Sequence, residues 1–345
     1  MKICVVGAGA IGGMLGVKFA SSGHDVTLIA RGANLNAIRA NGMRLRTSDG
    51  SELHAAGLRA TSSLAEVEPQ DLVILGMKAH QVEAVARDVP RLLHAQSIVL
   101  PMQNGIPWWY FQRVPEWASH TALATLANRR IASVDPDGII GESIDPARLI
   151  GCVVYPAAEL VAPGVVRHVE GDRFPLGELD GTESARVQAL SQAFVAAGLK
   201  APVLSDIRSE IWLKLWGNLS FNPISALTHS TLADICQFPV TRELAANMMR
   251  EAQAVGERLG AQFRVPLEKR IAGAEKVGRH KTSMLQDIEA GRDPEIDALV
   301  GAVIELGRDV GVPTPHIEAV YALVKLLGRT LKEDKVFIRA QSVAA

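Results

Sequence analysis

The chain has 345 residues, more than most single-core domains contain, and its length predicts two domains. Lys and Arg number 36 and Asp and Glu 37, so charge gives no reason to expect nucleic acid or an acidic membrane surface as partner. No apolar run reaches the roughly 18 residues that span a bilayer, and the glycine-interrupted N-terminus argues against a signal peptide. Three scattered cysteines without metal-ligand spacing predict free buried thiols, a cytoplasmic location and no metal site.

The N-terminal part alternates between β-like and helical patterns. Short apolar runs predict buried strands at residues 3–6, 25–30, 71–75 and 97–100, and helical periodicity predicts helices at 11–22 and 81–93. The alternation of strand, helix and strand predicts an α/β domain with a doubly wound, mostly parallel sheet.

The sequence pattern changes after residue 121. Gly, Pro and Asp interrupt short β-like runs at 149–154 and 164–169, which we expect to complete the first domain. A helix at 183–197 and a last strand at 201–204 lead to a boundary near Ser205, giving domains 1–204 and 205–345. Beyond it the chain is helical in pattern, with helices expected at 208–221, 241–259, 294–310 and 316–328.

Residues 7–12 read Gly-Ala-Gly-Ala-Ile-Gly, a G-x-G-x-x-G between the first strand and the first helix. Gly7 permits the tight turn, Gly9 lets a pyrophosphate approach the backbone, and Gly12 lets the helix pack against the strand. Ala10 and Ile11 lie at the N-terminus of the helix expected at 11–22, and such a terminus attracts phosphate. The loop predicts a dinucleotide site, and a glycine-rich turn without a ligand is the alternative.

Three polar residues follow strand ends, where ligands bind in open α/β sheets. Arg31 stands where NAD sites usually place an acid, so it predicts a partner for the 2′-phosphate of NADP(H), unless it is a solvated surface arginine. Lys78 and Asn104 follow the next two strands. A solvated loop cation and an Asn-Gly turn are their plainer interpretations.

The segment 210–223 places Lys214, Asn218 and Asn222 four residues apart on one face of an otherwise apolar helix, which Pro223 should bend or end. Such a polar face is costly to bury unless it lines a polar cleft, although it could simply face water. An ammonium can stabilise charge developing on a carbonyl oxygen and then deliver a proton, so Lys214 is the candidate general acid.

A second cluster lies further along the chain. Ser283 to Ile288 ends a helix before Gly291, and Asp293-Pro294-Glu295 has the pattern of an N-cap, a first-position proline and a first-turn acid. From local sequence alone, a favourable interaction with the helix dipole explains Glu295 best.

Together these pieces resemble the ketopantoate reductase (2-dehydropantoate 2-reductase) family across both expected domains. The matching stretches are GAGAIGG, Arg31, MKAHQ at 77–81, QNG at 103–105, EIWLKLWGNLSFNPISAL at 210–227 and TSMLQDIEAGRDPEID at 282–297. The resemblance implies a Rossmann domain followed by an all-α domain of the 6-phosphogluconate dehydrogenase-like type. It also implies NADPH as hydride donor, a branched 2-oxo acid as substrate, a role in pantothenate biosynthesis, and a possible homodimer.

Residue roles follow from the resemblance by position. Lys214 would be the general acid, and Lys78 and Asn104 would lie where nicotinamide meets substrate. The substrate's polar groups, including its carboxylate, would be held by Asn218, Asn222 and Ser283. Glu295 would bind its hydroxyl.

The segment 107–160 is longer than the family pattern and includes the aromatic run Trp108–Phe111. These aromatics serve packing or reshape the pocket, so the natural 2-oxo acid stays open. Two other functions also stay open: a 3-hydroxyisobutyrate- or 6-phosphogluconate-type dehydrogenase, and a dinucleotide-binding regulator without turnover.

Overall fold

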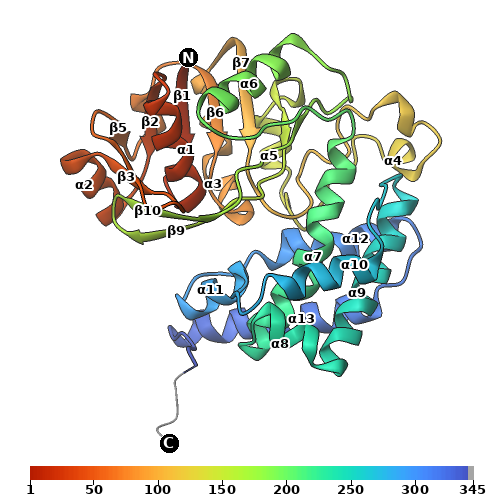
Figure 1. Cartoon of the computed structure of the whole chain (residues 1–345). Helices are drawn as coiled ribbons and strands as arrows, with labels where there is room; N and C mark the ends of the chain where they lie inside the picture. Colours follow the sequence, from red (N-terminus) through yellow and green to blue (C-terminus); the bar gives the residue numbers. More distant parts are fainter. Residues whose placement is uncertain (341–345) are drawn as a thin grey trace, which may run out of the picture.

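The computed structural model describes residues 1–340, which form an α/β part and a helical part that meet along α7 (Figure 1). A five-stranded sheet of order β5-β2-β1-β6-β7 forms the centre of the α/β part. Its strands are β1 (Lys2–Val6), β2 (Asp25–Ile29), β5 (Arg59–Thr61), β6 (Gln70–Leu75) and β7 (Leu93–Pro101). All four pairings are parallel, which confirms the predicted α/β class.

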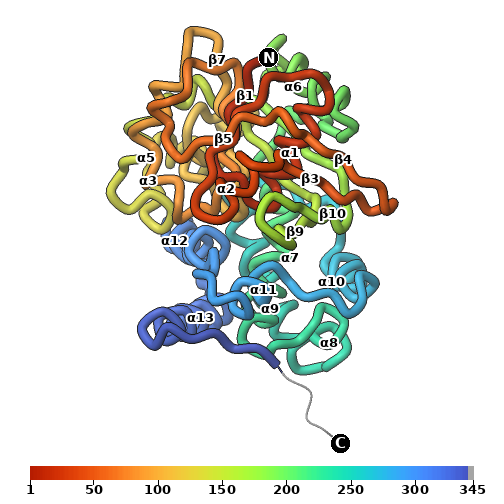
Figure 2. The backbone as a smooth tube through the Cα atoms, turned by 90° about the vertical axis from the view of Figure 1, so that its left-hand side faces the viewer, coloured from red at the N-terminus to blue at the C-terminus, as the bar shows by residue number. Residues whose placement is uncertain are grey.

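A second sheet, of order β4-β3-β10-β9, covers the first helix, α1 (Ala10–Ser21). Its strands are β3 (Met43–Arg46), β4 (Glu52–Ala55), β9 (Ala157–Ala162) and β10 (Val165–Glu170). Figure 2 shows this sheet beside α1. Gly13 permits the close approach, because a Cβ there would lie 2.2 Å from the Met43 methyl group. The pattern at 164–169 predicted β10, but β3 and β4 were not predicted.

The prediction of one helix at 81–93 is wrong. The segment instead forms 3₁₀ turns at Ala79–Gln81 and Val89–Leu92 around the four-residue α3 (Glu83–Ala86). Pro90 lacks the N–H that a continuous helix would need. Val82, Val85 and Val89 are buried all the same, so the periodicity identified the core-facing side correctly.

Two further helices flank the sheets, and short elements join the two parts. The helices are α2 (Gly32–Asn41) and α6 (Ala185–Ala196), and the short elements are α4 (Ala122–Thr125), α5 (Ile139–Ser143), β8 (Gly151–Cys152) and β11 (Leu176–Gly177). The predicted strand at 201–204 is reduced to an isolated bridge between Val203 and Leu176. The region is thus held by a few backbone hydrogen bonds rather than by a full strand.

The helical part consists of α7 (Ile207–Thr228), α8 (Leu232–Gln237), α9 (Pro239–Arg258), α10 (Leu267–Lys276), α11 (Ser283–Glu289), a π-helical turn (Asp297–Gly301), α12 (Ala302–Asp309) and α13 (Pro315–Asp334). Pro223 lies inside α7 and does not end it. Because α7 is buried along most of its length, packing stabilises the helix despite the hydrogen bond that proline cannot make.

The aromatic run 108–111 is buried and anchors the start of α7. Arg208, only 2% exposed, donates to the carbonyl oxygens of Tyr110 at 2.9 Å, Gln112 at 2.7 Å and Leu179 at 2.5 Å. The Trp212 indole donates to the Tyr110 hydroxyl at 2.8 Å. The packing interpretation of these aromatics is therefore confirmed, and they fix the position of the helix that carries Lys214.

Candidate functional site

The glycine loop leaves open the side on which a phosphate would approach. Gly7 has a φ of 104°, which favours glycine, and a Cβ on Gly12 would lie 2.1 Å from the Gly7 carbonyl oxygen. A Cβ on Gly9 would meet nothing within 4 Å. The loop leads into α1, a twelve-residue helix whose first N–H groups have no partner within the helix. Gly7, Gly9 and Gly12 thus have the geometry that a bound pyrophosphate requires.

Asn34, which the sequence did not single out, braces this loop. Its amide donates to the Ala8 carbonyl at 2.8 Å and accepts from the Gly164 N–H at 2.8 Å. It therefore ties the loop to α2 and to the β9–β10 turn. Arg31 starts α2 next to the loop, is exposed, and makes no side-chain hydrogen bond or ion pair within residues 1–340. Its guanidinium can therefore turn toward a ligand on the loop.

A cavity of about 370 Å³ lies beside the polar face of α7. It brings together five of the predicted side chains and the end of the glycine loop: Asn104, Lys214, Asn218, Asn222, Ser283 and Ile11. The side chains of Asn218, Asn222 and Ser283 make no hydrogen bond to any residue in 1–340, although Asn222 is only 6% exposed. Buried polar groups are normally satisfied, so Asn222 calls for a ligand or water, and half-buried Asn218 and exposed Ser283 are available to the same ligand.

Lys214 is partly buried and held by two acceptors. Its ammonium donates to Asn104 Oδ1 at 2.5 Å and to the Val154 carbonyl. Burial lowers the pKa of Lys214 to about 8, while the negative charge of Glu295 acts to raise it. An ammonium with this pKa is charged at neutral pH and still releases its proton readily, as a general acid must.

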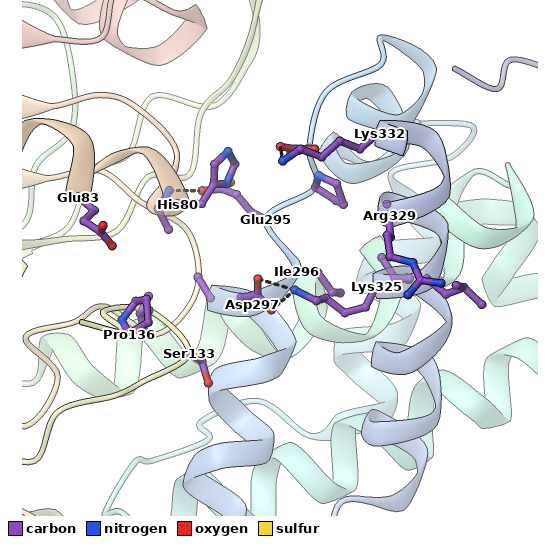
Figure 3. A pocket seen from close by; sticks show the side chains of 18 residues that line it. His80, Glu83, Ser133, Pro136, Glu295, Ile296, Asp297, Lys325, Arg329 and Lys332 are labelled. Carbon is purple, nitrogen blue, oxygen red and sulfur yellow. Dashed lines mark hydrogen bonds and ion pairs between the residues drawn. The ribbon is translucent and has the colours of Figure 1, made fainter. Parts of the chain in front are cut away.

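Glu295 is joined to Lys214 through Asn104. Its carboxylate accepts from the Ala79 N–H at 2.9 Å and from the Asn104 amide at 3.4 Å. Glu295 itself lines a second, larger cavity of about 810 Å³ between the α/β part and α13, where Figure 3 shows it facing the His80 loop. The two cavities are therefore linked by the Glu295–Asn104 hydrogen bond.

The prediction that Asp293 caps the start of a helix is wrong. Residues 292–295 are not helical, and a π-helical turn begins at Asp297. The reason is tertiary: the Asp293 carbonyl accepts from Lys78 at 3.2 Å, and Glu295 reaches the α/β part. Glu295 therefore precedes the helix instead of lying in its first turn.

Lys78 bridges the two parts of the molecule. Its ammonium lies 2.5 Å from Oδ2 of Asp287 on α11, and the other oxygen of that carboxylate, Oδ1, accepts from Arg292 at 3.0 Å. The Asp287 side chain is 9% exposed, so this ion pair is shielded from solvent on one side. Lys78 thus lies at the domain interface, near the Asp293 carbonyl, and no local pattern had indicated Asp287 as its partner.

Part of the longer segment 107–160 does form the site. Residues 154–159 line the cavity of Lys214, whereas Trp108–Phe111 do not. Arg270 of α10 also lines it and was not predicted.

Within residues 1–340, no helix is long and apolar enough to cross a membrane, and no group of three or more His, Cys, Asp or Glu side chains could hold a metal ion.

Comparison with known proteins shows the family of this chain. Residues 3–108 match the model of the ketopantoate reductase PanE/ApbA family, and residues 206–328 match that of its C-terminal domain. A 2-dehydropantoate 2-reductase of Mesorhizobium japonicum is 55% identical over 328 residues, covering 95% of this chain and 98% of the relative.

Solved structures extend the comparison. A Ralstonia solanacearum MolK2 protein assigned to the ketopantoate reductases superposes with a TM-score of 0.88 at 38% identity, covering 97% of this chain and 99% of that one. A D-mandelate dehydrogenase, solved with NADH and anilino(oxo)acetate, gives 0.80 at 25% identity and covers 96% and 100%. The same two-domain architecture thus occurs with more than one 2-oxo or 2-hydroxy acid.

The pKa of Lys214 can be tested directly. We expect Lys214 to react with a small amine-labelling reagent with a midpoint near pH 8, because only the neutral amine is nucleophilic. Glu295→Gln should move the midpoint to lower pH, since it removes a negative charge that raises this pKa. Mass spectrometry of labelled peptides across a pH series measures both, with exposed Lys269 in the same digest as calibration. An unchanged midpoint in Glu295→Gln would disprove the coupling.

Proposed function

Because this chain belongs to the ketopantoate reductase family, we propose that it reduces ketopantoate, or a closely related branched 2-oxo acid, to the 2-hydroxy acid with NADPH. The observation that carries the proposal is the Lys214 ammonium, which lines a cavity with Ile11 of the glycine loop and with three polar side chains that have no hydrogen-bond partner within residues 1–340: Asn218, Asn222 and Ser283. A proton donor, polar anchors and a dinucleotide loop meet there, as carbonyl reduction requires.

The residues of the glycine loop fit a dinucleotide. Gly7, Gly9, Ala10, Ile11 and Gly12 would hold the pyrophosphate at the N-terminus of α1. Arg31 would pair with the 2′-phosphate. Lys78 and Asn104 would lie near the nicotinamide end. When bound, the cofactor supplies the hydride, which no protein side chain can provide.

Lys214 supplies the proton. Asn104 and the Val154 carbonyl occupy two of its three N–H groups, which leaves one for the ketone oxygen of a substrate in the cavity. That oxygen gains negative charge during reduction, and the ammonium stabilises the charge before the proton transfers. The acceptors hold the ammonium in place, so little reorganisation is needed at the moment of reaction.

The remaining polar groups position the substrate. Asn218, Asn222 and Ser283 would donate to its polar atoms, including the carboxylate. The Glu295 carboxylate accepts one hydrogen bond on each oxygen, and each oxygen has a second lone pair with which it could accept from a substrate hydroxyl. Ketopantoate carries such a hydroxyl, whereas 2-oxoisovalerate lacks it.

A 2-oxo acid with a larger apolar or aromatic side chain is the second candidate substrate. Phe221, Leu232 and Val277 give the cavity an apolar side, and the wall at 154–159 belongs to the longer segment. The similarity to D-mandelate dehydrogenase supports this candidate. NADPH oxidation against a panel of 2-oxo acids, including ketopantoate and an aromatic one, separates the two. No turnover with any of them would refute the proposed function.

Lys214→Ala should lower kcat by roughly 10²–10⁴-fold while NADPH still binds, as expected for the loss of a general acid. In the unaltered protein, reduction should slow as the pH rises through about 8, because only protonated Lys214 donates. Stopped-flow or steady-state rates and fluorescence titration of NADPH measure the two effects. Exposed Lys269→Ala is the matched control. Near-normal kcat in a folded Lys214→Ala protein would refute the assignment.

Arg31→Ala should weaken NADPH binding far more than NADH binding. A charge-assisted hydrogen bond to the 2′-phosphate contributes roughly 1.5–3 kcal/mol, which corresponds to about 10- to 100-fold in Kd. Titration of both cofactors measures the difference, and exposed Arg91→Ala is the control. If both cofactors weaken equally, Arg31 does not bind the 2′-phosphate.

Glu295→Ala should reduce kcat/KM for ketopantoate far more than for 2-oxoisovalerate. A site built around a hydroxyl can reject the analogue that lacks it by as much as roughly 10⁴-fold. Because Glu295 also acts on the pKa of Lys214, the informative quantity is the ratio of the two substrates. Asp297→Ala, which alters the same larger cavity, is the control. Equal slowing of both acids would show that Glu295 does not bind the hydroxyl.

A further inference from the structure

Arg270 of α10 lines the Lys214 cavity with a guanidinium that has no protein partner. It makes no side-chain hydrogen bond and no ion pair within residues 1–340, and burial lowers its pKa. Other partly or fully buried arginines are satisfied: Arg208 by three carbonyl oxygens and Arg186 by Glu178 at 2.5 Å. A partly desolvated cation without a counter-charge is costly, so an anion from outside the chain would stabilise the Arg270 guanidinium.

The acidic side chains around the cavity do not supply that anion. Glu159 is paired with Arg167 at 2.6 Å, and Glu170 is exposed at the end of β10 without an ion pair in the described chain. Glu210, whose carboxylate accepts from the Tyr155 hydroxyl beside the cavity, is paired with Arg173 at 2.5 Å. The guanidinium therefore faces a cavity whose other charged wall residue on α7 is Lys214.

The guanidinium rests against α7 at Gly217. An ideal Cβ on Gly217 would lie 2.5 Å from Arg270 Nη2, so any side chain there would displace it. Gly217 is one turn from Lys214 and adjacent to Asn218, on the same side of the helix. In a 2-oxo acid, the carboxylate is one bond from the ketone carbon. A carboxylate-binding group must therefore lie near the proton donor, and Arg270 meets this need because its guanidinium lies against the next turn of α7 and lines the same cavity as Lys214.

We propose that Arg270 binds the substrate carboxylate and that Gly217 provides the space in which its guanidinium does so. The inference rests on the proposed reduction of a 2-oxo acid. A planar guanidinium matches a carboxylate with two parallel hydrogen bonds, which the neutral donors Asn218, Asn222 and Ser283 cannot supply as a charge-matched pair. Arg270 thus selects acids over neutral ketones, and Lys214 is left to act on the ketone oxygen.

Arg270→Gln should raise KM for the best 2-oxo acid by about 10- to 100-fold, with a smaller change in kcat. The decisive quantity is the ratio of kcat/KM for that acid and for its neutral methyl ester, which should fall about tenfold or more. Calorimetric titration with oxamate, an unreactive 2-oxo acid analogue, should show the same loss of affinity without turnover. Arg264→Gln, an exposed arginine in the loop before α10, is the control and should change neither quantity.

Gly217→Ala gives an independent test. Alanine favours helix over glycine, and the displaced atom is the end of a flexible side chain, so the protein should fold. It should lower the acid-to-ester ratio in the natural background and add little in the Arg270→Gln background, since the guanidinium is already gone.

An unchanged ratio in Arg270→Gln, equal effects on acid and ester, or full oxamate affinity would overturn the proposal. If the natural protein reduces no 2-oxo acid, the proposed function fails. The oxamate titration then still decides on Arg270, and failure of the natural protein to bind oxamate counts against it.

Discussion

α7 places the ammonium of Lys214 between the two parts of the molecule. That ammonium needs hydrogen-bond acceptors, and the residues around it supply them. Lys214 donates to Asn104, at the end of β7, and to Val154, in the segment that follows β8. Each acceptor comes from the α/β part, whereas the lysine comes from the helical part. An ammonium that is removed from water without such partners would be destabilising, so these contacts hold the two parts together, while burial at the same interface lowers the pKa of Lys214.

The interface between the two parts is therefore also the site. Glu295 reaches across it to Ala79 and Asn104, and Lys78 reaches in the opposite direction to Asp287. The longer segment contributes in two ways. Its aromatic beginning anchors α7 through Arg208, and its end at 154–159 forms a wall of the cavity. One segment thus supports the helix that carries Lys214 and also forms a wall of the cavity beside it.

Much of the fold follows from local sequence. Four strands of the central sheet (β1, β2, β6 and β7), α1, α6 and most helices of the second part were predicted because apolar periodicity records which side of an element is buried. β3, β4 and β5 were missed, since strands of three or four residues are too short to show a distinct alternation. The continuous helix at 81–93 was wrong because a periodic pattern does not reveal a break at Pro90. Pro223 was expected to bend or end its helix, yet α7 continues past it, because the packing of α7 outweighs the local cost of proline.

The sequence by itself determined the chemical groups of the site: the glycine loop, Lys214 and the amides that share its helical face, because spacing along a helix or after a strand is a local property. Only the tertiary structure decided which of them meet. Glu295 looked like a helix-capping acid and instead links Ala79 to Asn104, while Arg270 gave no local signal. Such roles depend on contacts between residues far apart in the chain, and the packing of two domains creates those contacts.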